Sequence, residues 1–332
     1  MEEANRIISD IKNQKFKPVY FLTGEEPYFI DYVASYIEKN VLSEDEKAFN
    51  QMVLYGRDVE VEDIISHAKR YPMMAERQII IVKEAQELAR TIENLDAYIE
   101  NPQPTTVLVL CYKYKKLDGR KKLLKTIKKS GVVLETKKLY ENQVGNWIQN
   151  TLKTSGYTIL PKATLMLVEF LGNDLSRIQN ELDKLMQIIK PEQQITPEII
   201  EENIGISKDF NNFELQNAIG SRDVKKAFQI AQYFANNPKE NPLVMTNALL
   251  YGYFSKVMKY HALTDTSKAA SVLGVSPFFV KDYQLAARNY PMRKVSAIIA
   301  KLRETDVKSK GVGAANLPQG DLLNELLAKI FD

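Results

Sequence analysis

Residues 18–29 read Pro18-Val19-Tyr20-Phe21-Leu22-Thr23-Gly24-Glu25-Glu26-Pro27-Tyr28-Phe29, a short apolar run that passes through one glycine and two carboxylates into a helical pattern. Four more apolar runs of strand length follow, and they are Met52–Tyr55, Ile79–Val82, Val107–Cys111 and Val132–Leu134. Segments with helical spacing separate them, including one helix predicted over Leu88–Ile99. Continuous apolar strands that alternate with helices are typical of a parallel sheet covered on both faces. The sequence therefore predicts a doubly wound α/β domain over residues 1–140.

Beyond residue 140 the strand pattern stops and helical spacing takes over. The expected helices are Asn142–Lys153, Lys162–Phe170, Asp174–Lys190, Pro197–Asn203, Asp223–Phe234, Pro242–Leu263, Pro277–Ala287, Met292–Val307 and Leu317–Phe331. Asp174 and Thr196 are expected to cap the helices that they precede. A polar break at Gly205–Asn212 divides the helices into two groups. We therefore predict two all-α domains, 141–209 and 210–332.

Composition excludes several classes of protein. Of 332 residues, 45% are hydrophobic and 26% charged, which is typical of a globular chain and not of a disordered or collagen-like one. Cys111 is the single cysteine, so no disulfide framework can form and an intracellular, cytoplasmic location is predicted. No apolar run approaches the roughly 20 residues that span a bilayer, and the acidic start MEEANRIISD does not resemble a signal peptide.

The net charge of +3 is unevenly spread. Residues 1–140 carry 23 Lys and Arg against 22 Asp and Glu, residues 141–209 carry 6 against 10, and residues 210–332 carry 16 against 10. A chain this close to neutral meets nucleic acid only through local patches or through partners.

The turn after the first strand has the position of a phosphate-binding loop without its chemistry. A P-loop needs a second glycine and a lysine, so that backbone N–H groups and an ammonium group surround the phosphates. Here the turn is Thr23-Gly24-Glu25-Glu26, whose two carboxylates suit the positive end of a helix and would repel a triphosphate. We expect a helix cap at this degenerate P-loop and no cofactor.

No metal or catalytic site is expected elsewhere. Where a nucleotide hydrolase would carry a metal-binding carboxylate after its third strand, this chain has Lys83 followed by Glu84. The two histidines, His67 and His261, lie far apart within helical stretches, where packing or solvent exposure is the expected role.

Six further segments form an ordered pattern together with residues 18–29. They are Tyr71-Pro72-Met73-Met74-Ala75-Glu76-Arg77-Gln78-Ile79-Ile80, Leu171-Gly172-Asn173-Asp174-Leu175, Glu181-Leu182-Asp183-Lys184-Leu185, Phe213-Glu214-Leu215, Leu273-Gly274-Val275-Ser276-Pro277-Phe278 and Glu304-Thr305-Asp306-Val307-Lys308. Taken in this order over nearly the whole chain, the segments resemble the delta-subunit family of the bacterial DNA polymerase III clamp loader.

The resemblance implies an AAA+-like fold without ATPase activity: a clamp-binding α/β domain (1–140), a helical lid (141–209) and a helical collar (210–332). It implies a hetero-pentamer with the ATP-hydrolysing gamma or tau subunits and delta-prime. The family binds the sliding clamp, the beta subunit, and opens it for loading onto primed DNA. The chain itself would not be an enzyme, although the holoenzyme is a DNA-directed DNA polymerase.

The segment Tyr71, Pro72, Met73 and Met74 is the sharpest candidate site. A helix that starts near Val61 should end by Tyr71, because the residue before a proline disfavours the helical conformation. Two methionines then lie in a turn, where they either close the end of the sheet or await a partner. The resemblance favours the second interpretation, since the family's clamp-gripping apolar pair falls on Met73 and Met74. The family often has Leu-Phe or Phe-Phe there, so this pair departs in shape.

A second candidate site is the basic stretch Lys113–Lys138, with eleven Lys and Arg against Asp118 and Glu135. Its predicted helix presents Lys121, Lys122, Lys125, Lys128 and Lys129. The stretch is either a solvated helix face or a contact with the DNA backbone or an acidic partner. Two other functions stay open: a P-loop ATPase or helicase-like motor, and a stand-alone DNA-binding repair factor. The missing P-loop residues count against the first, and the acidic middle region against the second.

Overall fold

The computed structural model describes residues 2–312 and 317–332, and the chain divides into two compact units, Met1–Leu139 and Tyr140–Asp332. Each unit is described by itself. Among the residues described, no helix combines the length and apolar character needed to cross a membrane.

The first unit is built on a five-stranded sheet. Its strands are β1 (Val19–Gly24), β2 (Gln51–Tyr55), β3 (Gln78–Lys83), β4 (Thr106–Lys113) and β5 (Val132–Thr136). They run in the order β2-β3-β4-β1-β5, and every pairing is parallel. All five predicted strands are therefore confirmed. The register places Gly24 opposite Lys113 on one side and Thr136 on the other, so β1 ends between two neighbouring strand ends.

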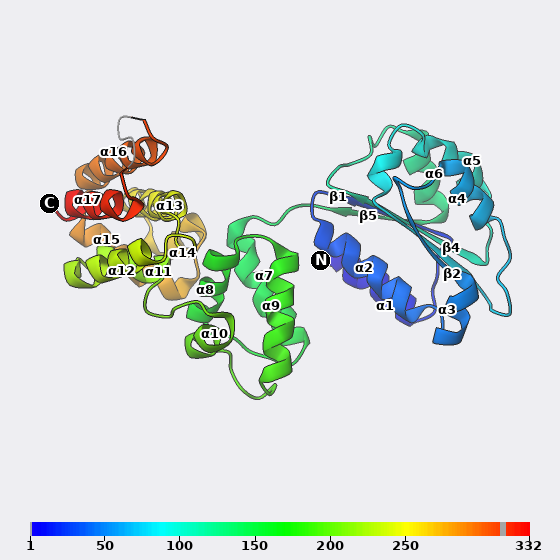
Figure 1. Ribbon diagram of the computed structural model, residues 1–332, viewed down its shortest axis with the longest axis horizontal. Helices are drawn as coiled ribbons and strands as arrows, with labels where there is room; N and C mark the ends of the chain where they lie inside the picture. Colours follow the sequence, from blue (N-terminus) through cyan, green and yellow to red (C-terminus); the bar gives the residue numbers. More distant parts are fainter. Residues whose placement is uncertain (1, 313–316) are drawn as a thin grey trace. The chain divides into compact units, whose positions relative to one another are not determined.

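Helices cover both faces of this sheet (Figure 1). The bounds are α1 (Glu2–Lys12), α2 (Pro27–Asn40), α3 (Glu44–Asn50), α4 (Val61–Ala68), α5 (Asp96–Glu100) and α6 (Lys122–Ser130). Helices α1 and α2 lie on one face, and α4, α5 and α6 lie on the other. Alternate strand residues such as Phe21, Ile80 and Leu108 join the core beneath α4 and α6. The doubly wound fold class is confirmed.

One predicted helix of the first unit forms differently. The stretch with apolar residues at Leu88, Ile92, Leu95 and Ile99 forms two 3₁₀ turns, η1 (Ala85–Leu88) and η2 (Ile92–Leu95), followed by the short α5. The N–H of Thr91 bonds to the carbonyl of Leu88 and that of Asn94 to Thr91, each at 2.9 Å. Residues three apart eclipse one another in such turns, so the same apolar spacing reaches the core without a regular helix.

The second unit is helical. Its α-helices are α7 (Glu141–Thr154), α8 (Pro161–Leu171), α9 (Leu175–Ile188), α10 (Pro197–Ile204), α11 (Asn212–Gly220), α12 (Val224–Asn236), α13 (Leu243–His261), α14 (Ala269–Leu273), α15 (Val280–Asn289), α16 (Met292–Ser309) and α17 (Gln319–Phe331), with 3₁₀ turns η3 (Thr266–Lys268) and η4 (Pro277–Phe279). Asp174 and Thr196 cap α9 and α10 as predicted. One apolar core joins α11, α12, α13, α15, α16 and α17.

Candidate functional site

The turn between α4 and β3 displays the predicted apolar pair. Helix α4 ends at Ala68 and β3 begins at Gln78, so Tyr71 and both methionines lie outside regular structure. Met74 is 99% exposed, Met73 59% and Tyr71 81%, while Pro72 is partly buried. The two methionines therefore do not close the end of the sheet, which was the alternative left open by the sequence. Large apolar side chains that are this exposed next to one another are typical of an interaction surface.

The turn is held in place by its neighbours. The buried side chain of Asn50, the last residue of α3, accepts a hydrogen bond from the N–H of Met73 (2.6 Å) and donates one to the carbonyl of the same residue (2.9 Å). Gln78 donates from Nε2 to the carbonyl of Arg70 (2.6 Å), which draws the two ends of the turn together. The guanidinium of Arg77 lies 4.2 Å from the ring centre of Phe16, a cation–π contact that ties the turn's exit to the α1–β1 linker.

Sequence reasoning missed Asn50. It lies 23 residues before Met73, in a helix that the apolar pattern did not indicate, so no local signal connects the two. A lone asparagine between a helical stretch and a strand can cap the helix, form a turn or bond to a distant backbone group. The tertiary structure determines which of these roles it has.

After β1, at the degenerate P-loop, the buried side chain of Glu26 and several backbone groups form a hydrogen-bonded turn. Glu26 caps α2 by accepting the N–H of Tyr28 on Oε1 (3.1 Å), which confirms the predicted helix cap. The N–H of Glu25 donates to the carbonyl of Thr136 (3.0 Å), and the hydroxyl of Thr23 donates to the carbonyl of Lys115 (3.0 Å). Gly24 has a φ of +135°, and a Cβ there would lie 2.1 Å from the carbonyl oxygen of Thr136. The glycine therefore allows the two strands to approach closely, and the N–H groups of Glu25 and Tyr28 already have acceptors within the protein.

Ion pairs occupy the carboxyl ends of the neighbouring strands. Lys113, at the end of β4, contacts Asp31 of α2 at 2.8 Å and Glu84 at 3.2 Å, and Lys83, at the end of β3, contacts Glu38 at 3.3 Å. Burial disfavours the charged form of Lys113, but its hydrogen bonds to the two carboxylates outweigh burial and raise its pKa. Lysine therefore stands where a hydrolase holds Mg²⁺, and the described residues contain no His, Cys, Asp and Glu group able to hold a metal ion.

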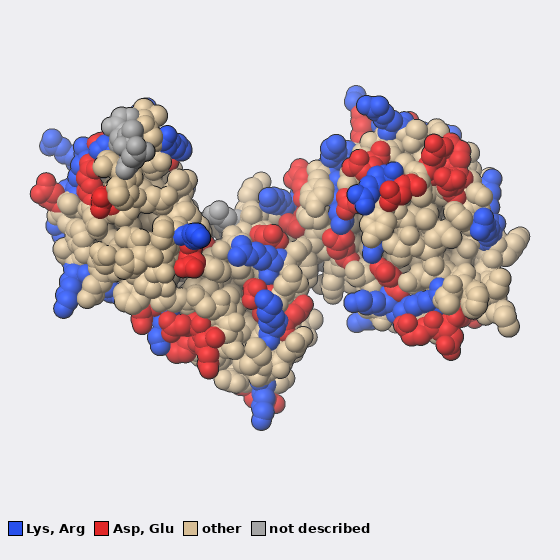
Figure 2. Space-filling view, viewed as in Figure 1, with Lys and Arg blue, Asp and Glu red and all other residues tan. Residues whose placement is uncertain are grey.

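The five lysines that the sequence places on the helix of the basic stretch divide into two sets. Lys121 pairs with Glu93, and Lys122 lies 2.6 Å from Asp96 and 2.7 Å from Glu100. For Lys125, Lys128 and Lys129, all exposed, the described part of the chain provides no ion pair. Figure 2 shows Lys and Arg side chains interspersed with Asp and Glu over the visible face, in keeping with the nearly neutral chain. Of these five lysines, the second set therefore has no ion pair with the described residues and can offer its charge to a partner.

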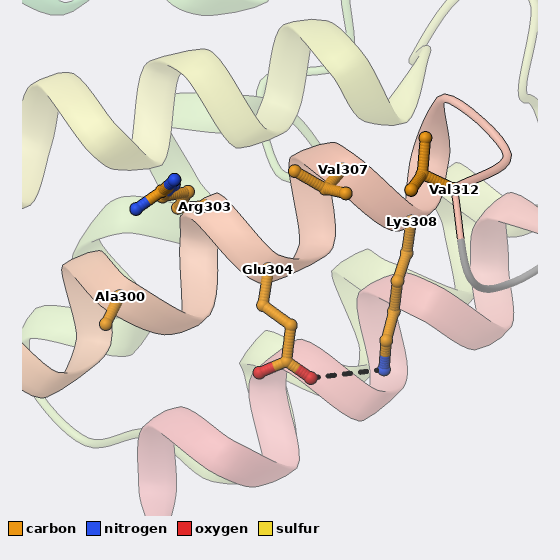
Figure 3. Close-up of a pocket in the computed structure, with 6 residues that line it drawn as sticks. All are labelled: Ala300, Arg303, Glu304, Val307, Lys308 and Val312. Atoms are coloured by element: carbon orange, nitrogen blue, oxygen red, sulfur yellow. Dashed lines mark ion pairs between the residues drawn. The ribbon is translucent and has the colours of Figure 1, made fainter.

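A shallow groove lies along α16 in the second unit. It has a volume of about 340 Å³ and is lined by Ala300, Arg303, Glu304, Val307, Lys308 and Val312. Figure 3 shows Glu304 and Lys308 pointing toward one another, 3.3 Å apart. Hydrogen bonds from Lys301, Lys329 and Lys308 lower the pKa of Glu304 to about 2. This carboxylate is therefore charged at neutral pH, and it suits a structural role better than a role in proton transfer.

The chain is similar to known proteins over nearly its whole length. The family described as "DNA polymerase III, delta subunit" matches residues 20–137, and its C-terminal domain matches residues 209–317. The DNA polymerase III subunit delta of Bacillus subtilis is 31% identical over 313 residues, which are 90% of each chain. A probable DNA polymerase III subunit delta of Aquifex aeolicus is 20% identical over 277 residues, 79% of this chain and 77% of that one.

A solved structure is also similar to this chain over nearly its whole length. The Bacillus subtilis DNA clamp loader delta protein matches with a TM-score of 0.56 and 28% identity, over 99% of both chains. The same family is indicated by the ordered sequence motifs, by the α/β unit followed by helices, and by the similarity to these relatives. The chain belongs to the DNA polymerase III delta subunit family.

Proposed function

We propose that this chain is a clamp loader subunit of DNA polymerase III that binds the sliding clamp through the Tyr71–Met74 turn and opens it for loading onto primed DNA. The observation that carries the proposal is the exposed pair Met73 and Met74 on a turn fixed by Asn50. Methionine is flexible and polarizable, so it fits an irregular apolar pocket, and burying one such side chain contributes roughly 1.5–3 kcal/mol. Two neighbouring anchors make a hot spot.

The subunit works without hydrolysing ATP itself. The degenerate P-loop has no lysine, the N–H of Glu25 is bonded to the carbonyl of Thr136, and Lys83 and Lys113 are the last residues of β3 and β4. Phosphoryl transfer depends on positioned charges and Mg²⁺, and in the described residues lysines stand at the strand ends where a hydrolase has a carboxylate for that ion. The energy for loading would come from the gamma or tau subunits, with delta-prime completing the hetero-pentamer, in the cytoplasm.

The double substitution Met73→Ala, Met74→Ala tests the proposal. We expect at least a hundredfold loss of affinity for the sliding clamp, because two anchors lose their buried surface. Both side chains are exposed in the free chain, so the melting temperature should stay within about 1 °C of wild type. Surface plasmon resonance with immobilised clamp gives the affinity, and thermal unfolding gives the stability.

The matched control is Met292→Ala, which shortens a methionine 42% exposed at the start of α16. It should bind the clamp like wild type. An unchanged affinity of the double variant would refute the clamp-binding turn.

A further inference from the structure

We propose that Asn50 is the positioning residue of the clamp-binding turn: it fixes the backbone of Met73 before the clamp arrives. The inference rests on the proposed function and adds a residue from another element, α3, to the site.

The contact is specific to an asparagine side chain. Oδ1 accepts the N–H of Met73 at 2.6 Å, and Nδ2 donates to the Met73 carbonyl at 2.9 Å and to the Glu46 carbonyl at 3.1 Å. The amide therefore pairs with both backbone groups of one residue, as a neighbouring strand would, and is anchored within its own helix. Asn50 is 4% exposed, so these bonds form away from water.

The platform beneath Asn50 is itself fixed. Ser43 and Glu46 form a capping box at the start of α3, with the N–H of Ser43 donating to Glu46 Oε2 at 2.9 Å. Strand β2 begins directly after Asn50, so the helix is held at its far end by the sheet. The position of Asn50 is thus set by the helix cap before it and by the strand that follows it.

The turn needs such support. Met74 has a φ of +53°, the left-handed region that non-glycine residues adopt only at a cost. Its side chain is almost fully exposed, so its own packing cannot offset that cost. Without Asn50 the turn would sample other conformations, and the clamp would have to order it on binding. A pre-ordered turn avoids this loss.

Two substitutions of Asn50 test the inference. Asn50→Ala should weaken binding to the sliding clamp about tenfold, which corresponds to about 1.4 kcal/mol. Asn50→Asp keeps an acceptor for the N–H but faces the Met73 carbonyl with a carboxylate, so it should weaken binding at least as much. In wild type the Met73 amide should exchange slowly with deuterium, and in Asn50→Ala it should exchange at least ten times faster.

Asn40→Ala is the matched control. Asn40 is the last residue of α2 and donates to the carbonyl of Tyr36 at 2.9 Å, the same local bond that Asn50 makes to Glu46, but it is exposed and reaches no turn. This variant should bind the clamp like wild type. It separates the loss of a helix-end hydrogen bond from the loss of the turn's support.

A double-mutant cycle distinguishes positioning from a general structural role. If Asn50 acts through the methionines, Asn50→Ala should cost no further affinity in the Met73→Ala, Met74→Ala background. Wild-type affinity of folded Asn50→Ala, or an additive loss in that background, would overturn the inference. If the methionine variant alone binds like wild type, the proposed function fails, and the exchange rate of the Met73 amide still decides whether Asn50 orders the turn.

Discussion

Glu169, on α8, has one carboxylate oxygen, Oε2, that is shut off from water and has no hydrogen-bond partner in the described part of the chain. The group also accepts the backbone N–H of Phe213. Desolvation raises the pKa of Glu169 to about 8; the N–H of Phe213 and the charge of Lys256 oppose the rise, and Glu214 adds to it. Between about pH 4.5 and pH 8, the folded chain therefore keeps a proton on Glu169 that the unfolded chain has released. Because the pKa is raised on folding, stability from this group is full below pH 4.5 and falls as pH rises toward 8.

Glu169→Gln should remove this pH dependence, because glutamine resembles the protonated acid. Part of the Glu169 side chain reaches the surface and keeps some water, so we expect a gain of roughly 1–3 kcal/mol at pH 7.5 and little change at pH 5. Urea unfolding followed by Trp147 fluorescence measures it, because this single tryptophan is buried in α7 of the same unit. Equal stabilisation at both pH values would show that Glu169 is charged in the folded chain.

Residues whose role is local were predictable, and residues whose role depends on the fold were not. Pro72 and the nearby strand predicted the Met73–Met74 turn, and Asp174 predicted its helix cap. Asn50 was missed because its partner lies 23 residues away, and Glu169 because its position in α8 gives no sign of a buried carboxylate. The exposure that selects between the two interpretations of the methionines also came only from the structure.

Among the elements, the strands were predicted best. Three of the five, β1, β3 and β4, lie between two other strands and are almost entirely buried, so their sequences are continuously apolar and easy to recognise. The short α3 was missed because its residues Glu44–Asn50 are mostly polar, and the 3₁₀ turns after β3 were predicted as one helix because the two forms share an apolar spacing of three to four residues.

Helix α6 is the element where paired and free charges can be compared. Changing Lys125, Lys128 and Lys129 to Gln should reduce the salt dependence of primed-DNA binding by the assembled loader, because each phosphate contact contributes about 0.9 to the slope of log K against log salt. A decrease of up to about 3 in that slope is expected. The matched control changes Lys121 and Lys122, whose charges are balanced by Glu93, Asp96 and Glu100. Equal slopes for wild type and the triple variant would make α6 a solvated face.

At the scale of the whole molecule, the two units carry different parts of the proposed function. The core beneath α4 and α6 draws its residues from the first unit, and the core around α13 draws its buried residues from the second. The Tyr71–Met74 turn proposed to bind the clamp, Asn50 and the degenerate P-loop all belong to the first unit. The proposed lid and collar, residues 141–209 and 210–332, stay a prediction within the second.

The first unit should therefore bind the clamp without the second. A fragment of residues 1–139 contains the complete sheet, the helices on both of its faces and the whole turn with its Asn50 support. We expect it to fold cooperatively and to bind the sliding clamp with a Kd within about threefold of the full chain, since it loses no residue of the proposed contact. It should not join the loader, because the proposed collar is missing.

The same fragment with Met73→Ala and Met74→Ala is the control for specific binding, and titration calorimetry measures the affinity of both fragments for the clamp. A folded fragment that binds the clamp more than tenfold more weakly than the full chain would place part of the clamp contact in residues 140–332.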